Sequence, residues 1–114
     1  MSGIINVLHF AVDGLTQQQQ AIANNLANSE TPGYTAQDVH FQSSLEQALQ
    51  SGNGGSASVS VAPDPAAPAT NGNNVDTGHQ IVAAEQNTLQ YQATVELLNA
   101  QFRLTQGAAG GSFQ

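Results

Sequence analysis

Two stretches with the same apolar spacing, one near each end of the chain, limit most strongly what this sequence can fold into. In the first, the intervals of three and four residues connect Ile5, Leu8, Val12, Leu15, Gln19, Ile22 and Leu26. In the second, the same intervals connect Ile81, Ala84, Thr88, Tyr91, Val95, Leu98 and Phe102. Such intervals place side chains on one face of an α-helix and are typical of a coiled-coil seam. The sequence therefore predicts two amphipathic helices, each with one seam.

The first predicted helix covers about residues 4–28. No proline interrupts this range, and Gly14 is its one weak point, at roughly 1 kcal/mol relative to alanine. Gln19 is the only strongly polar member of the seam. One polar residue in an apolar seam fixes the register of helix pairing at some cost in stability, so we expect Gln19 to set the register here.

The second predicted helix covers about residues 76–106. Asn74 or Asp76 can cap its start by accepting hydrogen bonds from the first free amides. Gly107 is expected to end it, because glycine readily adopts the left-handed conformation that is common just after a helix. The tail beyond this glycine is expected to be disordered. Three leucines lie off the seam and widen the apolar face: Leu89, Leu97 and Leu104.

The middle of the chain, residues 29–74, shows no sustained period. It opens with a Thr-Pro-Gly-Tyr turn signal, since proline presets its own φ and glycine can take a positive φ. We expect a short extended piece over 38–41, one or two helical turns over 41–49, and a brief strand over 59–61. The rest is rich in Gly, Ser, Pro and Ala and is typical of a flexible loop.

The predicted fold is mainly all-α, with two long terminal helices that pair antiparallel as a coiled-coil-like hairpin. Residues 1–28 form the N-terminal helix, 29–74 the turn motif and an irregular, partly disordered loop, and 75–114 the C-terminal helix and tail. Antiparallel pairing is the simplest way to bury both seams. A two-helix pair leaves an open flank on each helix, so the off-seam leucines stay exposed and mark an interaction surface.

Composition excludes several function classes. Lys and Arg together number 1 against 8 Asp and Glu, for a formal net charge of −7. Nucleic acids and anionic membrane surfaces are therefore disfavoured as partners, because both are bound through clustered basic residues. The chain has no cysteine, which excludes disulfides and thiolate metal sites. Its first residues lack the basic and apolar regions of a cleaved signal peptide, and we expect no membrane-spanning stretch.

No set of side chains points to catalysis or to a bound metal. His9, His40 and His79 lie in three separate segments without a neighbouring ligand pair. The carboxylates of Asp38 and Glu46 are eight residues apart on different predicted elements, so they do not form an acid–base pair. We therefore expect no enzymatic activity, no cofactor, no metal and no small-molecule substrate.

The junction between the first and second segments reads Asn-Asn-Leu-Ala-Asn-Ser-Glu-Thr-Pro-Gly-Tyr over residues 24–34. This string resembles the N-terminal signature of the flagellar rod, hook and hook-associated axial proteins. The run Leu89–Arg103, together with residues 72–76, resembles the C-terminal part of the proximal-rod member of that family. Only the Gly/Ser/Pro/Ala-rich middle is unmatched. The motif positions are Asn24, Asn25, Asn28, Thr31, Pro32, Gly33 and Tyr34.

The resemblance implies a structural subunit of the proximal rod of the bacterial flagellar basal body, which serves motility. Such proteins are exported by the flagellar type III apparatus without a cleaved signal peptide, and the rod lies in the periplasm. Their terminal helices pair and self-associate in a helical assembly, which makes the seam residues subunit-interface candidates. Expected partners are other rod subunits, the ring–rod adaptor and the membrane ring.

For the motif itself, Asn24 and Asn25 are candidates for hydrogen bonds to a neighbouring subunit. Asn28 is placed to cap the first helix, where asparagine tolerates left-handed geometry. Thr35 and Gln37 stand where relatives commonly carry basic residues, so no electrostatic docking contact is expected there. The alternatives are another axial rod or hook component, or a helical-hairpin adaptor or chaperone, which would explain the seams but not the turn.

Overall fold

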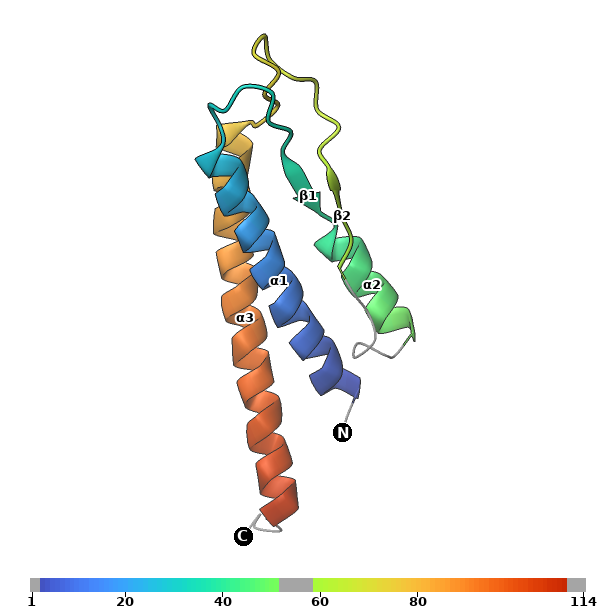
Figure 1. Cartoon of the computed structure of the whole chain (residues 1–114). Coiled ribbons are helices and arrows are strands. Elements are labelled where there is room, and N and C mark those ends of the chain that lie inside the picture. Colours follow the sequence, from blue (N-terminus) through green and yellow to red (C-terminus); the bar gives the residue numbers. More distant parts are fainter. Residues whose placement is uncertain (1–2, 52–58, 111–114) are drawn as a thin grey trace.

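Two long helices lie side by side and run antiparallel, and a smaller unit from the middle of the chain packs on one of them (Figure 1). The computed structural model describes residues 3–51 and 59–110. This arrangement confirms the predicted helical hairpin. The elements in chain order are α1 (Gly3–Ala27), β1 (Gln37–Val39), α2 (Phe41–Ser51), β2 (Val61–Pro63) and α3 (Thr77–Gly110).

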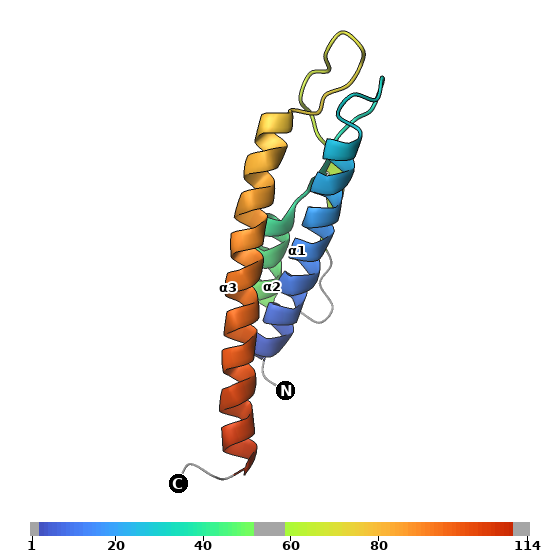
Figure 2. The ribbon, with the colours of Figure 1, turned by 90° about the vertical axis from the view of Figure 1, so that its left-hand side faces the viewer.

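The two terminal helices differ in length. α1 has 25 residues and α3 has 34, which correspond to about 38 and 51 Å at 1.5 Å per residue. Since the end of α1 lies beside the start of α3, the C-terminal part of α3 extends past the beginning of α1 (Figures 1 and 2). The structure is accordingly elongated, at 66 × 25 × 14 Å. Among the described residues, no helix combines the length and apolar character needed to cross a bilayer.

An apolar cluster lies between α1 and the middle unit. It contains Ala11, Leu15 and Ala21 of α1, with Val39 of β1 and Phe41 of α2. The side chains of Leu45 and Val59 pack against it. α1 therefore buries side chains on two sides, one against α3 and one against α2 and β1, which the single predicted seam did not anticipate.

Gly14 forms a notch in α1 that receives the ring of Phe41. A Cβ placed on Gly14 would lie 2.7 Å from Cδ1 of Phe41 and 2.9 Å from Cγ2 of Val59. Both distances are shorter than carbon atoms tolerate, so only a residue without a side chain fits here. The glycine that weakens α1 in sequence terms is thus the residue that lets Phe41 of α2 pack directly against the α1 backbone.

The middle segment has more regular structure than its composition predicts. β1 and β2 pair antiparallel with Val39 opposite Val61, so the predicted strand over 59–61 lies at 61–63 instead. His40 N donates to Ser60 O at 2.9 Å, which extends the pairing beyond the strands. α2 is also longer than one or two turns. The predicted Gly/Ser-rich loop over 52–58 lies outside the described residues.

The predicted start of α3 is confirmed, and its predicted end is not. Asp76 caps its start, since Oδ1 accepts a hydrogen bond from His79 N at 3.1 Å. The predicted end at Gly107 is wrong, because α3 continues to Gly110. Two alanines follow Gly107, and alanine has the highest helix propensity of all residues. Of the predicted disordered tail, residues 111–114 lie outside the described part.

Replacing Gly14 by alanine tests the notch. Gly14→Ala should lower the free energy of unfolding by about 1–2 kcal/mol, because overpacking against Phe41 outweighs the gain in helix propensity. Thermal unfolding followed by circular dichroism measures the change. Gly78→Ala is the matched control, since a Cβ at Gly78 meets only Asp76 Oδ1 at 3.5 Å and should leave the stability equal or higher. A stabilised Gly14→Ala would show that the notch is not filled.

Candidate functional site

Asn25 lies in the last turn of α1, at the end of the molecule where the turn motif follows this helix. Its side chain is buried, and the residue is only 1% exposed. Its Nδ2 donates to Gln37 O at 2.9 Å and to Gln80 Oε1 at 3.2 Å. Its Oδ1 accepts from Gln37 N at 2.9 Å and from the Tyr34 hydroxyl at 3.1 Å. A carboxamide can donate two and accept two hydrogen bonds, so this one is fully used. One side chain thereby joins α1, the turn, β1 and α3.

Two further asparagines tie the segment before α3 to the turn after α1. Asn73 Nδ2 donates to the carbonyl oxygens of Asn28 and Thr31, both at 2.7 Å. Asn74 Oδ1 accepts from Ala36 N at 2.7 Å, next to the start of β1. Together with Asn25 and Gln80, these residues form what we call the amide cluster: Asn25, Asn73, Asn74 and Gln80. It is built from uncharged groups, which do not titrate.

Two glycines let the loops on either side of the cluster approach each other. Gly33 has φ 76°, as its place after proline predicts, and Gly72 has φ 84°. A Cβ on Gly72 would lie 3.2 Å from the Cα of Gly33. Gly33 N donates to Asn71 O at 2.9 Å across this contact. The turn motif is therefore held by residues more than thirty positions further along the chain.

The motif residues divide into internal and external ones. The prediction that Asn25 bonds a neighbouring subunit is wrong, because its amide is buried and fully bonded within the chain. Asn24 is exposed, so its interface role stays a prediction. Asn28 Nδ2 donates to Asn24 O at 2.9 Å and its Oδ1 accepts from the Thr31 hydroxyl at 3.1 Å. It caps α1 without left-handed geometry, since only glycines have positive φ among the described residues. Thr31 and Pro32 are exposed.

The two seams differ in how far the chain covers them by itself. On α1, Ile5, Leu8, Leu15 and Ile22 are buried, Val12 and Leu26 are half-buried, and Gln19 is exposed. On α3 no seam residue is fully buried: Ala84, Val95 and Leu98 are half-buried, and Ile81, Thr88, Tyr91 and Phe102 are exposed. In the N-terminal part of α1, the centre of the His9 ring lies 6.2 Å from the centre of the Phe102 ring on α3. The role of these residues between subunits stays a prediction.

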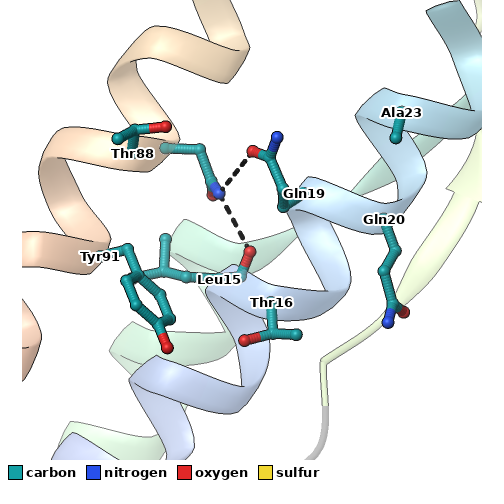
Figure 3. A pocket seen from close by; sticks show the side chains of 8 residues that line it. Leu15, Thr16, Gln19, Gln20, Ala23, Thr88 and Tyr91 are labelled. Carbon is teal, nitrogen blue, oxygen red and sulfur yellow. Dashed lines mark hydrogen bonds between the residues drawn. The ribbon is translucent and has the colours of Figure 1, made fainter.

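Two polar residues that sequence reasoning missed occupy the line of α3 that faces α1. Gln80 and Asn87 are 5% and 3% exposed. Asn87 Nδ2 donates to Leu15 O at 3.1 Å and to Gln19 Oε1 at 3.0 Å (Figure 3). Gln19 therefore has a partner on α3, although its effect on register is untested. The seven-residue interval between Gln80 and Asn87 was the available signal, because it places both on one helix face.

A second line of residues, which is apolar, runs along the side of α3 that faces away from α1. Its members are spaced by 7, 8 and 7 residues, and each interval is close to two helical turns. They are 54–67% exposed, which confirms the expectation for the off-seam leucines. A helix that is apolar on more than one side is normally buried on each of them. We call this line the outer stripe: Val82, Leu89, Leu97 and Leu104.

Removing the amide of Asn25 tests the cluster. Asn25→Ala should lower the free energy of unfolding by about 2–4 kcal/mol, because it leaves the buried amide of Gln80 and the part-buried backbone groups of Gln37 without their partner. Denaturant titration measures the loss. Asn24→Ala is the neighbouring control and should change stability by less than about 0.5 kcal/mol, as is usual for an exposed site. Equal effects of the two substitutions would contradict the central role of Asn25.

Comparison with known proteins agrees with this geometry. A family model described as "Flagella basal body rod protein" matches residues 8–35, which include most of α1 and the turn motif. The flagellar basal body rod protein FlgB of Bacillus subtilis is 34% identical over 115 residues, covering 89% of this chain and 88% of the relative. FlgB of Yersinia enterocolitica is 26% identical over 90% of each chain. FlgB of Escherichia coli is 29% identical over 76% of this chain and 78% of the relative. The chain therefore belongs to the FlgB family of flagellar basal body rod proteins.

Proposed function

We propose that this chain is a structural subunit of the proximal rod of the flagellar basal body and polymerises through its terminal helices. In that role it joins the membrane ring to the rest of the rod and serves flagellum-dependent motility. The observation that carries the proposal is the apolar outer stripe of α3. One side packs on α1, while the outer stripe is exposed in the single chain.

The size of the stripe suits a subunit that makes several contacts. Burying the part of these four side chains that is still exposed contributes roughly 4–7 kcal/mol, before any ordering cost. Association of two molecules costs about 4–15 kcal/mol in lost translational and rotational freedom. A single such contact therefore supports only weak pairing, whereas the several contacts that each subunit makes inside a rod support a stable assembly.

The family implies association with other rod components. More specifically, we propose that the ring–rod adaptor and the membrane ring are neighbours of the assembled subunit. We also propose that the chain reaches the periplasmic rod through the flagellar type III export apparatus, without a cleaved signal peptide. These assignments are supported by the turn motif over residues 24–34 and by the run Leu89–Arg103, which resemble the corresponding parts of rod proteins.

Charge placed on the outer stripe tests the proposal. Leu97→Glu should leave the helicity and stability of the isolated chain unchanged, because residue 97 is 58% exposed. It should abolish swimming and remove the chain from purified basal bodies, because a carboxylate would have to be desolvated at the contact. Swimming in soft agar and immunoblots of basal bodies measure both effects.

The matched control adds the same charge elsewhere on α3. Gln92 is exposed and lies outside the stripe, so Gln92→Glu should support normal swimming and normal incorporation. Normal motility of the Leu97→Glu strain, with the variant present in its basal bodies, would rule out the stripe as an assembly surface.

A further inference from the structure

We propose that a groove between α3 and the middle unit, which consists of β1, α2 and β2, binds an extended basic segment of a different protein. The inference goes beyond the proposed rod function and depends only on this groove, which contains no residue of the outer stripe. Three observations carry it: a groove lined by amides, three carboxylates in it without a Lys or Arg beside them, and an oriented, nearly buried amide donor that has no acceptor.

The groove exists because α3 and the middle unit both pack on α1 but not on each other. Among the helices and strands, α3 contacts α1 alone, and α2 and β1 also contact α1. The groove consists of two adjoining hollows of about 420 and 70 Å³, which share Gln18 and Val39 as lining residues. Its α3 wall runs from His79 to Gln90, which is about 17 Å at 1.5 Å per residue. This length accommodates about five residues of extended chain.

Glutamine side chains from all three walls line the groove. A carboxamide can both donate and accept hydrogen bonds. Several of them in one groove therefore suit an extended backbone, which presents N–H and C=O groups in turn. These residues are Gln18 of α1, Gln37 of β1, Gln42 of α2, and Gln80, Gln86 and Gln90 of α3.

Three carboxylates give the groove its charge. Asp38 and Asp64 line the narrower hollow, and Glu46 lines the wider one. No Lys or Arg is among the lining residues, although His40 and His79 are. The single Arg of the chain, Arg103, lies thirteen residues beyond Gln90. A groove lined by charges of one sign attracts ligands of the opposite sign, so its occupant should carry Lys or Arg side chains.

The orientation of the Gln80 amide follows from its neighbours. The Asn25 amide can lie only one way, because it accepts from Gln37 N and donates to Gln37 O. Asn25 therefore presents Nδ2 to Gln80, and Oε1 of Gln80 accepts this bond. The donor end of Gln80, its Nε2, is left over.

This donor is available to a ligand in the narrower hollow. Gln80 lines that hollow and is only 5% exposed. Its Nε2 donates to no group among the described residues. The atom is not sealed off, because Asn87 Oδ1 is the only buried side-chain atom in the described part that lacks a partner. Gln80 thus holds a fixed donor for one carbonyl oxygen of a bound segment.

The charge of the chain decides which protein supplies the segment. A second copy cannot neutralise three carboxylates, because each chain has only one Lys or Arg. Two copies with a formal net charge of −7 each also repel one another. The narrower hollow has the volume of about two water molecules in the liquid, which is enough for one peptide group beside Gln80. The occupant is therefore an extended basic segment of another protein.

Binding of a synthetic peptide to the full chain tests the proposal. The probe is a fluorescein-labelled peptide of alternating Lys and Thr, about five residues long, since threonine favours extended backbone. Fluorescence anisotropy should show saturable binding that weakens as salt is added. The same peptide with Glu in place of Lys should not bind. Absence of saturable binding by the Lys peptide would overturn the proposal, as would equally tight binding of spermidine, which has cationic groups but no peptide backbone.

Matched pairs of substitutions separate the groove from the overall charge. Asp38→Asn/Glu46→Gln neutralises two exposed groove residues and should weaken binding about five-fold. Glu85→Gln/Glu96→Gln removes the same charge from exposed positions on α3 outside the groove and should leave the affinity unchanged. An equal loss in both variants would mean that binding follows net charge alone, which overturns the groove as the site.

Nitrogen-15 NMR reports on Gln80 directly. Its Nε2 protons should shift downfield as the Lys peptide is added, because a carbonyl oxygen then accepts from them. The side-chain amide of Gln92, which is exposed and outside the groove, should not shift. An unmoved Gln80 signal at saturating peptide would overturn its assignment as the donor. None of these measurements involves assembly, so their failure leaves the rod function standing, and absence from basal bodies leaves the groove standing.

Discussion

The carboxamide of Asn25 is the interaction on which the rest of this molecule depends. It uses all four of its hydrogen-bonding positions to connect the end of α1 with the turn, β1 and the first turn of α3. Because each partner belongs to a different part of the chain, the antiparallel order of the helices and the position of the middle unit are fixed together. The neighbouring asparagines of the cluster repeat the same principle with the loop before α3.

The helices were predictable from the sequence, and the polar contacts between them were not. The intervals of three and four residues gave α1 and α3 to within a few residues, and Asp76 capped α3 as expected. The partners of Asn25 and Asn87 lie up to 55 and 72 residues away in sequence, and no local pattern reveals such pairs. α3 ends at Gly110 instead of Gly107, because the two alanines after Gly107 allow the helix to continue.

The middle of the chain shows a different reason for incomplete prediction. Its composition is typical of a flexible loop, yet Phe41 enters the notch at Gly14 and the strands pair beside it. A glycine inside a helix and an aromatic residue in the middle segment give no signal separately, and only the fold brings them together. Of the candidate site, the sequence identified the apolar residues and the turn motif, but it did not distinguish which amides face inward.

The single arginine of this chain, Arg103, has a consequence for how its assemblies respond to ionic strength. Contacts between copies cannot rely on paired opposite charges, because each chain has eight Asp and Glu side chains and only one strong base. Dissolved salt screens the repulsion between such copies within about 10 Å at 0.1 M and leaves contacts between apolar side chains and amides in place. An assembly of this kind tightens in media that loosen assemblies held by salt bridges.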